Sequence, residues 1–243
     1  MTSAQPLFYK KIVPLNKEQH KSLYIEPVEG YSFSKNTNSL YIAAVEFPKV
    51  APEYPIVFGI DKEGTVFPLV LLGLKTKQNL YVDSKGIWKA NYIPAYARRY
   101  PFILANPASK NSNDQFTVCI DEGYAGFNTA KEGQCLFDEK GNESSILKQA
   151  VDFMKDFQTH VELTSAFCKN LVTLDLLEPM QANIKMQSGE NYSIGGFQCV
   201  SRDKLKALPS EKLTELVKSD QMELIFAHLL SLNNVNSLMN KLN

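Results

Sequence analysis

The sequence has no excess of either charge. Its 26 basic and 26 acidic side chains give a formal net charge of zero. Nucleic-acid-binding proteins normally carry a basic excess or a basic stripe, because contacts with phosphates dominate their affinity. A neutral chain also has no field that would steer it onto an anionic membrane. We therefore expect no nucleic-acid partner.

Long apolar runs and an export signal are missing as well. The longest apolar run, residues 66–74, is far shorter than the roughly 20 residues that a membrane-spanning helix needs. The N-terminal sequence MTSAQPLFYKKIVPLN has no basic start followed by an apolar region and a small-residue cleavage site. These absences predict a protein without a transmembrane segment and with a cytoplasmic location.

Cysteine is scarce and scattered. The four cysteines, Cys119, Cys135, Cys168 and Cys199, form no CxxC pair. In a chain without a secretory signal, this pattern favours buried free thiols. Cys119 lies two residues before Asp121, and a histidine partner for a nucleophilic cysteine would have to come from elsewhere in the fold.

The first part of the chain, about residues 1–143, is β-rich. Short runs rich in Val, Ile, Phe and Tyr are bounded by Pro, Gly, Asn or Asp, which predicts strands. Gly64 lies in a turn between two of these runs, where a positive φ suits a hairpin. The predicted strands cover residues 40–47, 55–60, 66–74, 78–83 and 116–121, and a further strand, turn and helix start lie in 134–145.

From Ser144 the hydrophobic period becomes that of a helix. Apolar residues recur at three- and four-residue spacing from Leu147 to Leu171, so we predict an amphipathic helix that could break near residues 159–160. Residues 182–200 alternate like a β-hairpin with its turn at 188–191, followed by three short helices.

Two local features refine this picture. Gly195-Gly196 inside the predicted hairpin indicates a bulge or a close backbone approach, and Asn233-Asn234 indicates a junction between two helices. With no repeat and no linker, we predict a single α+β domain over residues 1–243. Its N-terminal half would hold a mixed or antiparallel sheet packed by helices, and its part from about 144 to 243 would be helix-rich with one hairpin.

Several segments resemble a known family. They are YPIVFGI, NLYVDSKGIWKANYIPAYARRYPF, CLFDEKGN and AHLLSLNNVNSL, in this order along the chain. The sequence resembles the bacterial SapC-like family over nearly its whole length. The family name implies association with a surface layer, and relatives are often labelled peptide-transporter permeases, which conflicts with the missing membrane span. Neighbouring genes for flavin-dependent halogenases and outer-membrane receptors imply an accessory role. The resemblance implies no catalytic residues.

The stretch YIPAYARRYPFIL, residues 92–104, places two adjacent arginines beside an apolar run. Pro94 suits the first turn of a short helix, because its missing N–H needs no partner there. The helix would have about two turns and end before Pro101, and a buried strand would follow. Adjacent helical residues point about 100° apart, so only one of Arg98 and Arg99 can face inward.

Two interpretations of these arginines remain open. An inward guanidinium could grip a carboxylate or a phosphate, with nearby tyrosines as a stacking wall. Alternatively, it pairs with Asp83, Glu46 or a helix carbonyl and fixes the helix to the sheet. Trp88 could line the same pocket or belong to the core. The candidate ligand-binding residues are Trp88, Tyr92, Tyr96, Arg98, Arg99, Tyr100 and His228.

The three histidines give little sign of metal chemistry. His160 and Glu162, with the distant His228, match the order of ligands in a non-haem iron site, but residues two apart on a helix do not share a face. We therefore predict no metal site. His228 lies on a mostly apolar helix face, which favours a hydrogen-bonded, half-buried imidazole over a general base. His20 lies in a polar stretch and is predicted to be solvated.

An apolar stripe near the C-terminus has two interpretations. It could dock on a partner chain or pack on the protein's own sheet, and its spacing favours the second. The stripe consists of Met222, Ile225, Leu229, Leu232 and Val235.

These observations favour an accessory protein without catalytic activity or a cofactor, which binds a small anionic ligand or a partner protein at the tyrosine–arginine stretch. One alternative is an enzyme that uses the same residues with His228 or a carboxylate such as Asp83. Another is a surface-layer or envelope component. The sequence does not indicate an oligomeric state.

Overall fold

The computed structural model of the chain describes residues 6–105, 116–185 and 191–242, and it describes the backbone alone for 182–185 and 191–194. The architecture is α+β, as predicted, and the strand pairs of the described residues are antiparallel.

The strands form three sheets. A five-stranded sheet has the order β10-β11-β4-β5-β3, and two three-stranded sheets have the orders β1-β7-β6 and β8-β2-β9. The strands are β1 (Ile12–Pro14), β2 (Tyr24–Ile25), β3 (Ser39–Tyr41), β4 (Ile56–Ile60), β5 (Val66–Leu71), β6 (Phe102–Ala105), β7 (Thr117–Asp121), β8 (Phe127–Asn128), β9 (Gln134–Cys135), β10 (Leu177–Lys185) and β11 (Asn191–Val200).

The helices gather in the C-terminal part, as expected from the change in hydrophobic period. In the part of the chain that the structure describes, no helix is both long enough and apolar enough to cross a membrane. The helices are α1 (Phe47–Val50), α2 (Ala95–Arg98), α3 (Ser145–Thr173), α4 (Arg202–Lys206), α5 (Ser210–Lys218), α6 (Gln221–Ser231) and α7 (Asn234–Asn240), with short 3-10 helices at η1 (Ser32–Ser34) and η2 (Ala44–Glu46).

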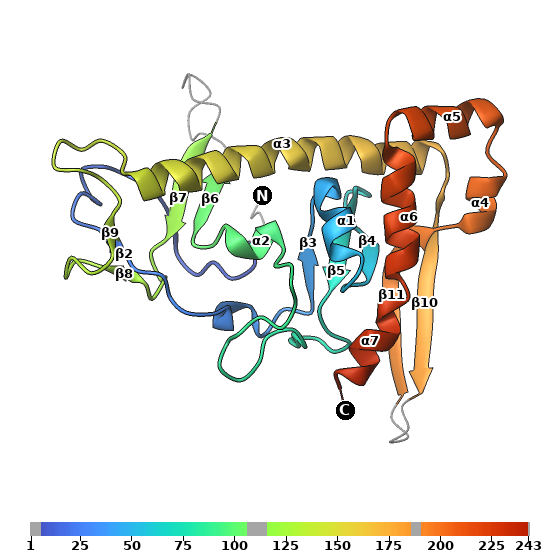
Figure 1. Cartoon of the computed structure of the whole chain (residues 1–243), viewed down its shortest axis with the longest axis horizontal. Helices are drawn as coiled ribbons and strands as arrows, with labels where there is room; N and C mark the ends of the chain where they lie inside the picture. The colour runs from blue at the N-terminus through green and yellow to red at the C-terminus, as the bar shows by residue number, and fades with distance from the viewer. Residues whose placement is uncertain (1–5, 106–115, 186–190, 243) are drawn as a thin grey trace.

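Helix α3 runs along the length of the molecule (Figure 1). Its 29 residues correspond to about 43 Å at the rise of an α-helix. Ser144 caps its start by accepting a hydrogen bond from the Leu147 N–H, and the helix continues without a break through residues 159–160. The predicted apolar stripe is its buried face, so the periodicity located this helix correctly.

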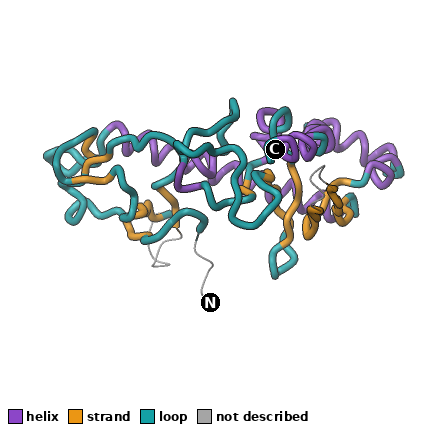
Figure 2. The backbone as a smooth tube through the Cα atoms, turned by 90° about the horizontal axis from the view of Figure 1, so that it is seen from below, coloured by secondary structure: helices purple, strands orange, loops and turns teal. Residues whose placement is uncertain are grey.

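This helix joins two hydrophobic clusters. Near its N-terminal end, Leu147 and Met154 pack with residues of β6 and β7, whereas Phe167 and Leu171 pack with residues of β4 and α1. Figure 2 shows the strands in separate groups along the long axis. Helix α2 lies beneath α3, between β6 and β3 (Figure 1), so the predicted arginine stretch sits where the two clusters meet.

Two predicted strands are wrong in whole or in part. Only residues 40–41 of the run 40–47 belong to a strand, because the Glu46 carboxylate accepts the Ala43 N–H at 2.8 Å and turns the chain into η2 and α1. The run 78–83 is a loop with one isolated bridge at Val82. There, the Asn79 side chain accepts the Tyr81 N–H at 2.9 Å, which replaces a ladder hydrogen bond with a local turn.

The turn predictions are confirmed where the chain is described. Gly64 has a φ of +83° in the hairpin between β4 and β5. Gly195 and Gly196 oppose a single residue of β10, which makes the expected bulge. Leu232 and Asn233 separate α6 from α7, which begins at Asn234. Most of the predicted hairpin turn at 188–191 lies outside the described residues.

Candidate functional site

Helix α2 sets the direction of the two arginines. It begins after Pro94 and consists of four residues, so it is one turn long instead of the expected two. The chain then passes the cis peptide bond between Tyr100 and Pro101 and enters β6. The Arg98 side chain is exposed and the Arg99 side chain is half-buried, but both guanidiniums lie over rings of α3, so the two arginines differ in burial and not in the element that they face.

Each guanidinium lies close to two aromatic rings. The Arg98 guanidinium carbon is 5.6 Å from the centre of the Tyr92 ring and 5.0 Å from that of Phe153. The corresponding distances for Arg99 are 4.0 Å to Tyr96 and 5.2 Å to Phe157. Rings stacked on the flat faces of a guanidinium stabilise its charge and leave its N–H edges for hydrogen bonds.

A buried carboxylate is linked to Arg98 through Tyr92. The Arg98 Nη2 donates to the Tyr92 hydroxyl at 3.2 Å, and this hydroxyl donates to Glu46 Oε1 at 3.0 Å. Glu46 is 3% exposed and also accepts the Ala43 and Ala95 N–H groups. Burial, together with the charge and hydrogen bond of Glu46, raises the pKa of Tyr92 to about 12, so Tyr92 remains a donor at neutral pH.

Arg99 has no charged partner among the residues that the structure describes. Its Nε is buried and, within those residues, makes no hydrogen bond. The ion pairs found there involve lysines and His20. Asp83, one of the partners considered for the inward arginine, pairs instead with Lys89 at 3.0 Å. The inward cation is therefore held by aromatic rings and by a hydrogen bond with the Tyr9 side chain, and it is not neutralised by a carboxylate.

Both arginines line one cavity of about 250 Å³ where α2, β6 and α3 meet. We call it the arginine cavity. Its lining residues are Arg98, Arg99, Phe102, Ile146, Gln149, Ala150 and Phe153. The chain has three arginines, so two of the three face this small, mostly apolar space.

Two of the candidate residues, Tyr100 and Trp88, point elsewhere. The Tyr100 hydroxyl donates to Asp121 Oδ2 at 3.1 Å, and its ring packs against Phe33. Trp88 is buried, and its Nε1 donates to the Tyr54 hydroxyl at 2.7 Å. Neither residue lines the arginine cavity. The structure thus brings Tyr92, Tyr96, Arg98 and Arg99 together and places Trp88 in the core, one of its two expected positions.

His228 ties α6 to the five-stranded sheet. It is fully buried, its Nε2 accepts the Val200 N–H at 3.0 Å, and its Nδ1 lies 2.9 Å from the Ile56 carbonyl oxygen. Burial lowers the pKa of His228 to about 4. The hydrogen bond with the Ile56 carbonyl oxygen acts in the opposite direction, but its effect is smaller. Both ring nitrogens are occupied by backbone groups, as in the hydrogen-bonded imidazole favoured by the sequence.

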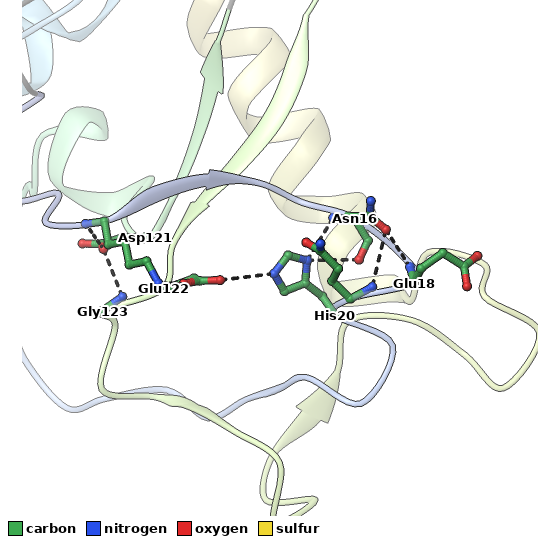
Figure 3. Close-up of polar contacts among 8 residues, drawn as sticks. Asn16, Glu18, His20, Asp121, Glu122 and Gly123 are labelled. Carbon is green, nitrogen blue, oxygen red and sulfur yellow. Dashed lines mark hydrogen bonds and ion pairs between the residues drawn. The ribbon is translucent and has the colours of Figure 1, made fainter. Parts of the chain in front are cut away.

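The prediction for His20 is wrong. His20 is 7% exposed and lies between Asn16 and Glu122 (Figure 3). Its Nδ1 accepts the Asn16 N–H at 2.9 Å, and its Nε2 is 3.7 Å from Glu122 Oε1. The His20 N–H also donates to the Asn16 carbonyl oxygen, and this tight turn folds the ring inward while residues 17–19 remain exposed.

The remaining cysteine, histidine and carboxylate positions form no metal centre in the described part of the chain, where no three such side chains cluster. All four cysteines are free thiols. Cys119 and Cys168 are buried as predicted, whereas Cys135, on the two-residue strand β9, and Cys199, on β11, are half-buried.

The C-terminal apolar stripe packs on the protein's own core. Ile225 and Leu229 are buried there, and Met222, Leu232 and Val235 lie against the same cluster. This stripe is therefore not a free docking face.

Sequence reasoning missed the side chains that α3 contributes to the cavity. Gln149 and Phe153 lie four residues apart on this helix and flank its apolar stripe. Four-residue spacing places two side chains on one face, so a second, mixed stripe beside the buried one was the available signal.

The comparisons with known proteins agree with the resemblance. A family model described as SapC matches residues 15–238, which include every residue of the arginine cavity. No curated protein and no solved structure matched the chain. Because the match covers nearly the whole chain, the chain belongs to the SapC family.

Proposed function

We propose that this protein is an accessory protein that binds a small anionic ligand at Arg98 and Arg99 and catalyses no reaction on it. The observation that carries the proposal is the pair of guanidiniums that face one cavity without a carboxylate partner among the described residues. Arg99 is half-buried, and a charge removed from water without an opposite charge beside it is costly, so an anion that pairs with Arg99 would be stabilised.

The stacking geometry supports this proposal. Tyr96 and Phe157 cover Arg99, and Tyr92 and Phe153 cover Arg98, which restricts both guanidiniums. A restricted guanidinium loses less conformational entropy when it binds, and its fork of N–H groups matches the two oxygens of a carboxylate or phosphate. The site is therefore organised before the ligand arrives.

The composition of the cavity supports binding without catalysis. Its lining consists of two arginines, one glutamine and four apolar residues. None of these side chains is a nucleophile or exchanges protons near neutral pH, as covalent and acid–base catalysis require. His228, the residue considered as a general base, is buried at the sheet with both nitrogens bound.

Calorimetric titration of the purified protein with sodium acetate and with sodium phosphate tests the proposal. We expect binding of at least one anion, weakened tenfold or more in Arg99→Lys, because a lysine cannot donate in a bidentate fork. Arg202→Lys is the matched control, since Arg202 is exposed on α4, away from the cavity. Equal affinities in the wild type and Arg99→Lys, or no binding at all, would contradict the proposal.

A further inference from the structure

We infer that the ligand of the arginine cavity is a monocarboxylate with an apolar body the size of one ring. This inference rests on the proposed function, because it specifies which anion the cavity takes. It follows from three properties of the site: its local charge, its size and the apolar residues that line it.

The local charge favours a single negative charge on the ligand. Arg98 and Arg99 supply two positive charges, and the Glu46 carboxylate lies two hydrogen bonds behind Arg98, through the Tyr92 hydroxyl. Lys49 adds a further positive charge, with its Nζ 5.9 Å from the centre of the Tyr92 ring, but its side chain is exposed and therefore screened by water. The buried charge that remains uncompensated is small, so a monoanion is enough for it, whereas a dianionic phosphate would bring a second negative charge close to the buried Glu46, and like charges at short distance repel.

The size of the cavity favours a small ligand. Its volume of about 250 Å³ is below the roughly 300–1,000 Å³ that drug-sized ligands occupy. Benzene fits an apolar cavity of roughly 150 Å³. The arginine cavity is open to solvent and has room for one ring and its carboxylate group, so a nucleotide or a second ring system would extend beyond its lining.

The lining favours an apolar body over a purely ionic ligand. Phe102, Ile146, Ala150 and Phe153 make up the larger part of the lining beside the two arginines. Burying apolar ligand surface against such side chains is favourable roughly in proportion to its area. Inorganic phosphate and acetate have almost no apolar surface to bury, so they would use the arginines and leave this part of the cavity unfilled.

Calorimetric titrations with benzoate, acetate, phenyl phosphate and inorganic phosphate test the inference. We expect benzoate to bind at least tenfold more tightly than the other three. Phe153→Leu should weaken benzoate binding at least threefold and leave acetate binding within twofold. Phe226→Leu is its matched control, because Phe226 is an exposed phenylalanine on α6 that lies outside the cavity.

The outcomes separate this inference from the proposed function. If phosphate or phenyl phosphate binds as tightly as benzoate, and binding still falls in Arg99→Lys, the site binds anions and the monocarboxylate inference is wrong. If benzoate affinity is unchanged in Phe153→Leu, the apolar part of the inference is wrong. If no anion binds in a way that depends on Arg99, both proposals are wrong.

Discussion

The guanidinium carbon of Arg99 lies 4.0 Å from the centre of the Tyr96 ring. This stacking holds a half-buried cation in place where the described residues offer it no carboxylate. Contacts of this kind are worth about 0.5–2 kcal/mol, the larger values applying when water is excluded. The ring of Tyr96, more than its hydroxyl, should therefore control the anion affinity of the site.

Exchanging Tyr96 tests this dependence. Tyr96→Leu removes the ring, so we expect the affinity for benzoate to fall at least threefold in a calorimetric titration. Tyr96→Phe keeps the ring and loses the hydrogen bond that the hydroxyl accepts from the Leu7 N–H, and should stay within twofold of the wild type. Equal losses in the two variants would show that the stacking does not hold Arg99.

The hydroxyl of Tyr92 stands between Arg98 and the buried Glu46. Tyr92→Phe deprives Glu46 of one hydrogen-bond donor, and a buried group that loses a partner costs about 1–3 kcal/mol. We expect the free energy of unfolding in urea to fall by that amount. In a Glu46→Gln background the same substitution should cost less, because the pair is coupled. Additive losses would contradict the link between the two residues.

A buried pair in the larger hydrophobic cluster gives a second test of stability. Trp88 Nε1 donates to the Tyr54 hydroxyl at 2.7 Å, and both side chains are buried. Tyr54→Phe leaves the indole N–H without its acceptor and also removes the hydrogen bond that the hydroxyl donates to the Tyr92 carbonyl oxygen, so the free energy of unfolding should fall by about 1–3 kcal/mol. Tyr81→Phe removes the hydrogen bond to the carbonyl oxygen of Glu53, which is half-exposed. The free energy of unfolding should therefore fall by less in this variant. The reverse order of losses would contradict this assignment.

His228 should make stability depend on pH. Burial lowers its pKa to about 4 in the folded protein, whereas an unfolded chain has a histidine pKa of about 6.5. The unfolded state therefore binds a proton first as the pH falls. The stabilisation is complete above about pH 6.5 and is lost progressively toward pH 4, by up to about 3 kcal/mol.

NMR titration of the histidine ring nitrogens checks the cause directly. The chain has three histidines, and His160→Gln and His228→Gln assign two of the signals. We expect the His228 signal to titrate near pH 4. A midpoint near 6.5 would show that His228 does not cause the loss of stability in acid.

The parts of the fold that follow from local chemistry could be predicted. The periodicity from Leu147 to Leu171 identified α3 and its buried face, and Pro94 and Pro101 bounded α2. The strand predicted at residues 78–83 was wrong, because the side chains of Asn79 and Asp83 form turns there in spite of the strand-like composition. Such side-chain turns depend on the chain around them, which a propensity does not capture.

Only half of the candidate site could be predicted from the sequence. Arg98, Arg99, Tyr92 and Tyr96 come from one short segment, whose helix geometry fixes their directions. Phe153 and Gln149 come from α3, some 50 residues further along the chain, and no local pattern connects the flank of that helix with α2. Glu46 was considered as a direct partner of the inward arginine, but it reaches the outward one through a tyrosine.

The proposed function depends most on anion binding by Arg98 and Arg99, and NMR of the arginine side chains measures this binding directly. The chain has three arginines, so a spectrum of the Nε–H groups has three signals, which Lys substitutions assign. On titration with benzoate, we expect the signals of Arg98 and Arg99 to shift and saturate together while that of Arg202 stays in place. No shift at Arg98 and Arg99, or an equal shift of all three signals, would contradict the account.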